Sequence, residues 1–239
     1  KENDFLYDMI IAGGGLAGLV CAIVLSRAGF KILLLEKKTY PFHKVCGEYV
    51  SNEVIDFFNS FGFDPFSFNA SHIERLRVSD PSGKNIFINL DMGGFGISRY
   101  TMDHALSLKA FESGAIVLEN CRVTDISFNG SLFTVSSTCG DFNSRFVIGS
   151  YGKRDMLDKK LDRQFIRQRT GYIGVKYHIT LDYPVNEIGL DNFPGGYCGI
   201  VKIENGKYNL CYLYKRNISD DFKSIRELEE KILFTNPVI

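Results

Sequence analysis

Residues 7–36, YDMIIAGGGLAGLVCAIVLSRAGFKILLLE, determine the fold expected for the first part of the chain. The apolar run at residues 7–12 ends in glycines, which is typical of a buried parallel strand followed by a turn. Residues 16–28 are predicted to form a helix, with Gly29 as its C-cap. Residues 31–36 are predicted to form a second buried strand, so the stretch makes one βαβ unit.

The turn of this unit carries the pattern Gly13-x-Gly15-x-x-Gly18, and Glu36 follows Gly18 by 36 − 18 = 18 residues. Such glycines allow a tight turn, close approach of backbone amides to a pyrophosphate, and close packing of helix on sheet. The helix N-terminus attracts phosphates, and a carboxylate at position 36 accepts hydrogen bonds from a ribose diol but repels a 2′-phosphate. This context favours a dinucleotide site over a glycine-rich turn without a ligand. The cofactor-binding residues predicted here are Gly13, Gly15, Leu16, Ala17, Gly18, Glu36 and Lys37.

Composition excludes several classes of partner. The 239 residues include 28 Lys plus Arg and 28 Asp plus Glu, so the formal net charge is zero. Neither a nucleic-acid surface nor a polybasic membrane patch is therefore expected. The six cysteines form no CxxC pair, which argues against a metal site and against a disulfide scaffold. We expect reduced thiols and a cytoplasmic location.

The apolar segment at residues 9–25 resembles a signal sequence or a membrane span at first sight. Three glycines at 13–15 interrupt it, and the acidic residues Glu2, Asp4 and Asp8 precede it. A secretory signal needs a basic n-region, and a span needs about twenty uninterrupted apolar residues. No integral membrane span is therefore expected. Because the first residue is Lys, we expect the start of the chain to have been trimmed.

The remaining pattern predicts mixed helices and strands up to about residue 155 and long antiparallel strands after it. Ser51 is the expected N-cap of a helix that reaches Phe61, and another helix is expected at 103–113. Hairpin turns are expected at Pro81-Ser82-Gly83, Asn129-Gly130 and Asn205-Gly206. Further strands are expected at residues 72–80, 85–91, 115–119, 123–128, 132–137, 146–149, 172–181, 197–203 and 207–214, and a last helix at 220–234.

Three more segments carry motifs: KVCGEYVS at 44–51, SRYTMDHAL at 98–106 and VIGSYGKR at 147–154. Together with the glycine turn and Glu36, they resemble the FAD-dependent superfamily that contains para-hydroxybenzoate hydroxylase and the geranylgeranyl reductases. The resemblance is closest to the geranylgeranyl reductase-like branch, with its Lys-x-Cys-Gly-Gly/Glu-x-x-Ser loop. The second segment is similar to the family's Arg-x-x-x-Asp-x-x-Leu, and the third to its Gly-Ala-Asp-Gly-x-x-Ser.

The resemblance implies which side chains lie near the flavin. Lys44, Cys46, Gly47 and Arg99 are the residues so implied. Cys46 is the candidate catalytic residue, as a thiol that faces the flavin or the substrate; a small buried filler is the alternative. Arg99 could instead be a surface cation, and His43 is expected to be a solvated loop residue rather than a base.

The last motif segment departs from the family pattern. The resemblance implies that Gly152 binds the cofactor. Tyr151, however, stands where the family has Asp, and Asp155 stands at or beside the usual Ser. The interaction of that Asp is lost, which weakens the case for direct NAD(P)H handling at this turn.

The resemblance also implies a fold class: α/β, with a Rossmann-like FAD/NAD(P)-binding domain and an inserted, mostly antiparallel β substrate domain. The binding domain is expected to comprise residues 1–70 and 91–155, and the substrate domain residues 71–90 and 156–239. Aromatic residues of the second part either line an apolar substrate pocket or pack in the core. They are Tyr172, Tyr177, Phe193, Tyr197, Tyr208, Tyr212 and Tyr214.

The function implied is that of an FAD-dependent oxidoreductase, with NAD(P)H as a candidate electron donor and a small hydrophobic organic substrate. A reductase that passes hydride to a carbon–carbon double bond and a monooxygenase both fit, and the loop at 44–48 favours the reductase. The absence of Trp excludes the Trp-x-Trp-x-Ile-Pro signature of tryptophan halogenases. A non-catalytic module that binds FAD or a nucleotide is the alternative. A peripheral membrane surface and a redox protein are further candidate partners.

The resembled family returns to its FAD domain through a later Gly-Asp motif. This sequence has no Gly-Asp after Gly140-Asp141, which is wrongly placed. We therefore expect the chain to be a fragment that lacks the C-terminal segment of the FAD domain, and to bind FAD poorly by itself.

Overall fold

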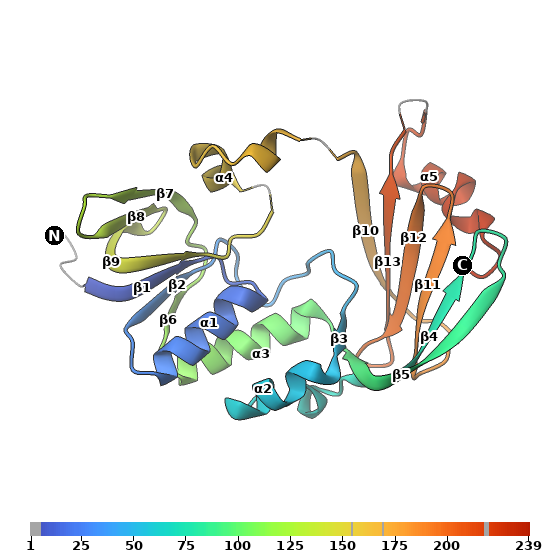
Figure 1. Cartoon of the computed structure of the whole chain (residues 1–239), viewed down its shortest axis with the longest axis horizontal. Helices are drawn as coiled ribbons and strands as arrows, with labels where there is room; N and C mark the ends of the chain where they lie inside the picture. Colours follow the sequence, from blue (N-terminus) through green and yellow to red (C-terminus); the bar gives the residue numbers. More distant parts are fainter. Residues whose placement is uncertain (1–5, 154, 169, 218–219) are drawn as a thin grey trace. The chain divides into compact units, whose positions relative to one another are not determined.

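The computed structural model describes residues 6–153, 155–168, 170–217 and 220–239. It divides into two compact units, each with one sheet (Figure 1). The first unit comprises Lys1–His43 and Tyr100–Arg169, and the second comprises Lys44–Arg99 and Thr170–Ile239. Arg154, the last residue of the motif segment at 147–154, lies outside the described residues.

The first unit contains a six-stranded sheet in the order β6-β2-β1-β9-β8-β7. Its strands are β1 (Leu6–Ala12), β2 (Ile32–Leu35), β6 (Ile116–Leu118), β7 (Val123–Phe128), β8 (Phe133–Ser137) and β9 (Gly140–Gly149). Its helices are α1 (Leu16–Arg27), α3 (Arg99–Glu112) and α4 (Met156–Lys160), with a 3-10 turn at Gln164–Arg167. Figure 1 shows α1 and α3 on the same face of this sheet.

Three parallel strands place the glycine turn at one edge of the sheet. Strand β1 pairs in parallel with β2 and with β9, and Ala12 is the register partner of both Leu35 and Gly149. The carboxyl ends of these strands therefore coincide. The residues that follow them, Gly13, Glu36 and Ser150, meet at this edge, where ligands bind in open parallel sheets.

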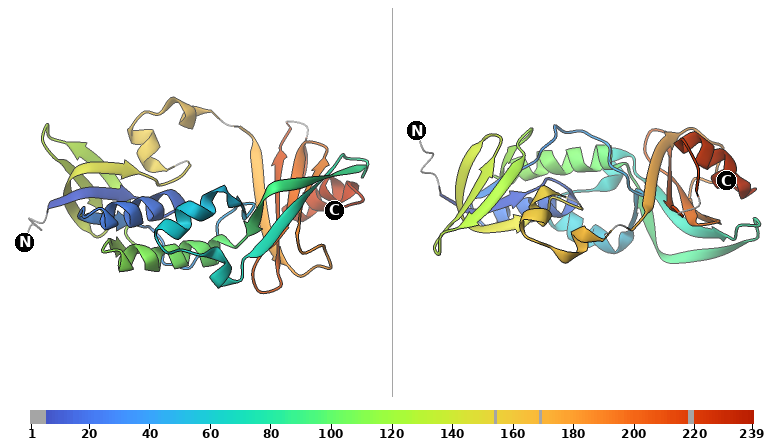
Figure 2. Two further views of the ribbon diagram at one scale, coloured as in Figure 1. Left: turned by 60° about the horizontal axis from the view of Figure 1, so that its bottom comes forward. Right: turned by 90° about the horizontal axis from the view of Figure 1, so that it is seen from above.

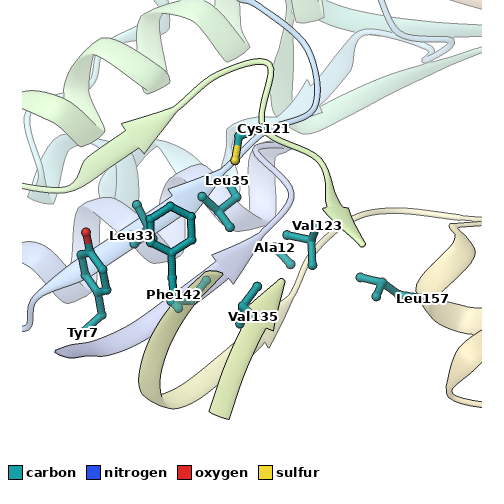
Figure 3. Close-up of a cluster of buried hydrophobic side chains, with 10 residues drawn as sticks. Tyr7, Ala12, Leu33, Leu35, Cys121, Val123, Val135, Phe142 and Leu157 are labelled. Carbon is teal, nitrogen blue, oxygen red and sulfur yellow. The ribbon is translucent and has the colours of Figure 1, made fainter. Parts of the chain in front are cut away.

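The core of the first unit forms where alternate side chains of the central strands meet those of the antiparallel strands. Figure 3 shows Leu33, Leu35, Val135 and Phe142 pointing into one cluster. Tyr7 packs edge-on against Phe142, with ring centroids 6.4 Å apart. Burial of such side chains contributes about 1.5–3 kcal/mol each, which holds the sheet that carries the turn.

The second unit contains a seven-stranded sheet in the order β10-β13-β12-β11-β4-β5-β3. Its strands are β3 (Tyr49–Ser51), β4 (Ser71–Ser79), β5 (Asn85–Gly96), β10 (Tyr172–Ile179), β11 (Glu187–Phe193), β12 (Gly196–Lys202) and β13 (Tyr208–Lys215). Its helices are α2 (Ile55–Ser60) and α5 (Ile225–Lys231), with 3-10 turns at Asn52–Val54, Pro65–Phe68 and Leu233–Thr235. All neighbours are antiparallel except β4 and β11.

One face of this second sheet is covered by α5, as the two further views in Figure 2 show. Phe193, Tyr208, Tyr212 and Tyr214 are buried there together with Leu228 of the helix. Four of the seven aromatic residues considered for a substrate pocket therefore pack in the core. Among the described residues, no helix combines the length and the apolar character needed to cross a membrane.

Most expected elements are present, and the α/β fold with a mostly antiparallel second sheet is confirmed. The hairpin turns are confirmed as well; at the last one, both Asn205 (φ 59°) and Gly206 (φ 69°) have positive φ, as a type I′ turn requires. Two strands and a helix were missed, namely β3, β11 and α4.

Several expected boundaries were wrong. Helix α3 begins at Arg99, so Asp103 lies inside it rather than at its start. Strand β9 begins at Gly140 rather than at 146, because its first half pairs with β8 and its second half with β1. The last helix is shorter than expected, because Ser224 caps it by accepting the Glu227 N–H (3.1 Å).

The compact units divide the chain at other positions than the expected domains do. Residues 44–70 belong to the second unit, because β3 pairs with β5. Residues 156–169 belong to the first unit, because Leu157 packs in the core of Figure 3. The assignment of one part to cofactor and the other to substrate remains a prediction.

Candidate functional site

The glycine turn in the first unit is built so closely that side chains are excluded from it. Gly13 has φ +106°, and a Cβ there would lie 2.5 Å from the Cα of Tyr151. Its N–H donates to the Leu35 carbonyl (2.9 Å), and its own carbonyl accepts from Ser150 Oγ (2.7 Å). The turn is therefore fixed to both neighbouring strands before any ligand arrives.

Two further glycines bring helix α1 against this turn. A Cβ at Gly18 would lie 2.1 Å from the Gly13 carbonyl oxygen. At Gly14, a Cβ would lie 1.9 Å from the hydroxyl of Tyr40, which donates to the Gly14 carbonyl (2.5 Å). Tyr40, which sequence analysis did not single out, therefore packs directly over the turn.

Glu36 is buried beside the turn and accepts two backbone hydrogen bonds. Its Oε2 accepts the Gly14 N–H (2.8 Å), and its Oε1 accepts the Lys38 N–H (3.0 Å). Each carboxylate oxygen can accept more than one hydrogen bond, so the group retains capacity for a ribose hydroxyl. The carboxylate is thus held in one orientation, and it also orients the Gly14 amide.

The N-terminus of α1 is open to an anion. Its N-cap residue is Gly15, no side chain caps it, and its first turn contains no acidic residue. The first N–H groups of a helix have no partner within the helix, and the helix dipole adds a partial positive charge there. The residues of this turn, including Leu16, Ala17 and Gly18, therefore fit a phosphate group.

The turn after β9 carries Tyr151 at the position where the family pattern has Asp. Tyr151 packs against the core cluster, and its hydroxyl donates to Asp158 Oδ1 (3.3 Å). Burial, together with the nearby Asp158 carboxylate, raises the pKa of Tyr151. Gly152 follows with φ +81°, and Lys37 forms an ion pair with Asp155 (3.2 Å).

In the second unit, the loop at residues 44–48 is anchored through Glu48, which sequence analysis quoted only as part of the motif. The Glu48 carboxylate contacts Lys176 Nζ (2.5 Å) and His178 Nε2 (2.6 Å), and it accepts the backbone N–H of Arg99 (2.7 Å). The side chain of Glu48 is fully buried. The backbone of Arg99 therefore lies beside the loop that carries Cys46, while the distance of its side chain from a flavin stays a prediction.

The backbone of the same loop is held by strand β13. Asn209 Nδ2 donates to the carbonyls of Cys46 (3.2 Å) and Gly47 (2.8 Å). The Glu48 N–H lies 3.5 Å from the Cys46 Sγ and donates to it. Cys46 is partly exposed rather than a fully buried filler.

The face of the second sheet opposite α5 carries this loop and two of the remaining aromatic residues. Pairing places Lys176 opposite Cys211, and Tyr197 opposite Leu213. Side chains alternate along a strand, so Tyr172 and Tyr197 share the face of Lys176. Both are about half exposed, so exposed aromatic rings and the loop of Cys46 lie on the same face of the sheet.

Sequence patterns gave part of this arrangement. The predicted residues of the first unit gather at one edge of its sheet, and Cys46, Gly47 and the backbone of Arg99 gather around Glu48. Lys44 is half-buried in the same loop, and His43 stacks on Tyr100, with ring centroids 4.7 Å apart. The roles given to these residues stay predictions. Sequence analysis missed Tyr40, Lys176, His178 and Asn209.

Comparisons with known proteins agree with the geometry. Residues 11–57 match the family model described as an NAD(P)-binding Rossmann-like domain. A digeranylgeranylglycerophospholipid reductase of Methanoculleus marisnigri is 33% identical over 53% of this chain and 32% of that protein. The menaquinone reductase of Mycobacterium tuberculosis is 25% identical over 85% of this chain and 54% of that protein. The chain thus spans about half or less of the length of these relatives.

Two solved structures share the fold. A geranylgeranyl bacteriochlorophyll reductase-like protein of Thermoplasma acidophilum matches 94% of this chain and 61% of its own, with a TM-score of 0.78 and 19% identity. A halogenase in complex with phloroglucinol and FAD matches 94% of this chain and 56% of its own, with a TM-score of 0.76 and 16% identity. The predicted resemblance and fold class are therefore confirmed: the chain has the fold of FAD-binding oxidoreductases.

Proposed function

We propose that the protein is an FAD-dependent oxidoreductase that acts on a hydrophobic organic substrate, as a reductase rather than a monooxygenase. The observation that carries this proposal is the glycine turn, with its uncapped helix N-terminus and its buried Glu36 carboxylate. Such an edge of a parallel sheet suits a dinucleotide. A cytoplasmic location forms part of the same proposal.

The residues present fit FAD. The first-turn amides of α1 would hold the pyrophosphate, Glu36 would hold the adenosine ribose, and Lys37 and Gly152 flank this edge. Lys44, Cys46, Gly47 and Arg99 are proposed to lie near the isoalloxazine. When bound, the flavin supplies the redox chemistry, while the protein supplies orientation and electrostatics.

The substrate class is supported by two observations. The relatives are named for polyprenyl-type lipid and quinone substrates, and the loop of Cys46 shares a sheet face with Tyr172 and Tyr197. Aromatic rings bury large apolar areas on binding. NAD(P)H, a redox protein and a peripheral membrane surface remain proposed partners.

The deciding experiment is an anaerobic titration of the purified full-length, FAD-loaded protein with NADH, NADPH and dithionite. Bleaching of the flavin absorbance by a nicotinamide, followed by reoxidation on adding a polyprenyl substrate, is the expected result. If dithionite reduces the flavin but neither nicotinamide does, the electron donor is a redox protein. If the reduced flavin is reoxidised only by oxygen, the reductase is ruled out. Insertion of oxygen into an added substrate would then identify a monooxygenase, and its absence would favour a module that binds FAD without turnover, in line with the loss of the Asp at Tyr151.

Changing Glu36 to Gln is expected to weaken FAD binding about tenfold to a hundredfold, because the NH₂ that replaces one oxygen cannot accept from a ribose hydroxyl, and a buried donor left without a partner costs about 1–3 kcal/mol. Both Glu36 oxygens accept backbone N–H groups. The amide of Gln offers only one oxygen, so its NH₂ would face a second donor. Fluorescence titration of the full-length protein with FAD measures the effect. Glu112→Gln, at an exposed position on α3, is the control; equal affinity for FAD in both variants would refute the assignment of Glu36.

A further inference from the structure

Glu48 has a backbone conformation that L side chains rarely adopt. Its φ is +56°, in the left-handed region where glycine is favoured. Its carbonyl accepts the Ile97 N–H (3.1 Å), which ties the residue to the end of strand β5. A glycine would adopt this conformation without strain, so a glutamate here requires a compensating interaction.

The compensating interaction is a buried ionic cluster. Lys176 and His178 lie two residues apart on β10 and share a face of the strand. Lys176 contacts Oε1 of the Glu48 carboxylate, and His178 contacts Oε2. The side chain of Lys176 is 6% exposed and that of Glu48 is not exposed. Charges removed from water interact strongly and persist only when paired.

The loop that this cluster contacts also carries a thiol. With φ of Glu48 fixed, the Glu48 N–H is aimed at the Cys46 Sγ (3.5 Å). The Cys46 and Gly47 carbonyls are held at the same time by Asn209. Every contact in this chain of interactions lies within the second unit.

We infer that Glu48 is a positioning residue: through Lys176 and His178 it locks the loop at 44–48 onto strands β10 and β13, and so fixes the thiol of Cys46. A catalytic role for this placement rests on the proposed function, whereas the placement itself does not depend on that function. It assigns to Lys176 and His178 a role in the site that their place in the sequence does not indicate.

The test is the rate at which Cys46 reacts with iodoacetamide, followed by mass spectrometry of its peptide in the full-length protein. The thiolate sulfur displaces iodide, forming one S–C bond as the C–I bond breaks. In Glu48→Gly, which permits the same φ but removes the anchor, we expect alkylation of Cys46 to be about tenfold faster, because loops that lose their contacts open more often. In Glu48→Gln, whose neutral amide oxygen can still accept from Lys176 but offers it no counter-charge, we expect a smaller acceleration than in Glu48→Gly.

An internal reference separates release of the loop from unfolding. Burial raises the pKa of the Cys198 thiol to about 12, so it reacts slowly while the sheet is folded. Acceleration of Cys46 without acceleration of Cys198 supports the inference. Equal acceleration of Cys198 would show that Glu48 merely stabilises the fold, and would overturn it. Glu53→Gln, at an exposed nearby position, is expected to leave all rates unchanged.

A second variant addresses the charge that Glu48→Gly leaves unpaired. In the double variant Glu48→Gly/Lys176→Met no buried ammonium remains, and we expect Cys46 to stay about tenfold faster, since the anchor is still missing. A return to the parental rate, or an unchanged rate in Glu48→Gly alone, would overturn the inference. Because alkylation is measured without substrate or nicotinamide, failure of the proposed function would leave these results interpretable.

Discussion

Replacing Gly18 with Ala is expected to abolish tight FAD binding and to lower the stability of the first unit by about 1–3 kcal/mol, the usual cost of overpacking a core. A Cβ at this position would lie 2.1 Å from the Gly13 carbonyl oxygen and 2.7 Å from Ser150 Oγ. The Gly13 carbonyl cannot move freely, because Ser150 donates to it and the Gly13 N–H is bonded to β2. Helix α1 would have to separate from the turn, which carries its N-terminal amides away from a phosphate.

Helix propensity alone predicts the opposite sign, since Ala is favoured over Gly in a helix by about 1 kcal/mol. The variant therefore separates close packing from propensity. FAD affinity is measured by fluorescence titration and stability by thermal unfolding; we expect affinity to fall by on the order of a hundredfold. Gly199→Ala is the matched control, because the added methyl meets its neighbours at 3.6 Å or more. A Gly18→Ala protein as stable as its parent would contradict the packing described here.

The parts of the fold that follow from local sequence were predicted well. The βαβ unit, its glycine turn and the position of Glu36 depend on contiguous apolar runs and on glycines that no other residue can replace. Turn chemistry likewise sufficed at Asn205-Gly206. In each case the constraint lies within a few residues of the element that it defines.

Strand β11 was missed because its acidic residues are buried, while apolar residues beside them are more exposed. Its buried positions include Glu187 and Asp191, whereas Ile188 and Leu190 are only partly buried. Alternation of apolar residues is the usual signal for a half-buried strand, and here the acidic residues occupy the inner face. Their partners, Arg75 and Arg77, lie more than 100 residues earlier, on the parallel neighbour β4. No local pattern contains that information.

The same limitation applies to the anchor of the Cys46 loop. Glu48 stands in a recognisable motif, but Lys176 and His178 lie 128 and 130 residues further along the chain. In sequence they are two basic residues at alternate positions of a strand, a pattern that usually marks a solvated face. Their role became visible only when the fold brought β10 to the loop. Tyr40 was missed similarly, because its contact with Gly14 follows from the path of the chain after β2.

The buried acidic residues of β11 lead to the second large expected effect, a loss of stability. Asp191→Ala is expected to lower stability by about 3–5 kcal/mol, the usual cost of removing one partner from a buried ion pair. Asp191 is fully buried; its Oδ2 accepts from Arg77 Nη2 (2.7 Å) and its Oδ1 from Ser79 Oγ (2.8 Å). Without it, the contacts described for Arg77 are Glu187, 3.9 Å from its Nε and too far for a hydrogen bond, and the ring of Tyr183, 5.2 Å from its guanidinium carbon. In thermal unfolding the midpoint should fall by roughly 6–20 °C, at about 2–4 °C per kcal/mol for a chain of this size.

Two comparisons test whether burial, rather than the ion pair itself, sets this cost. Arg226 and Glu230 on α5 form a pair with a similar N–O distance, 2.8 Å, but both are well exposed, and such pairs contribute little because water solvates the separated charges. Glu230→Gln should therefore leave the midpoint unchanged. Arg77→Met/Asp191→Leu removes both buried charges, and most of the lost stability should return, because the penalty comes from the unpaired guanidinium. If the double variant were as unstable as Asp191→Ala, the loss would instead reflect the hydrogen bond to Ser79 and the packing of β11 on β4.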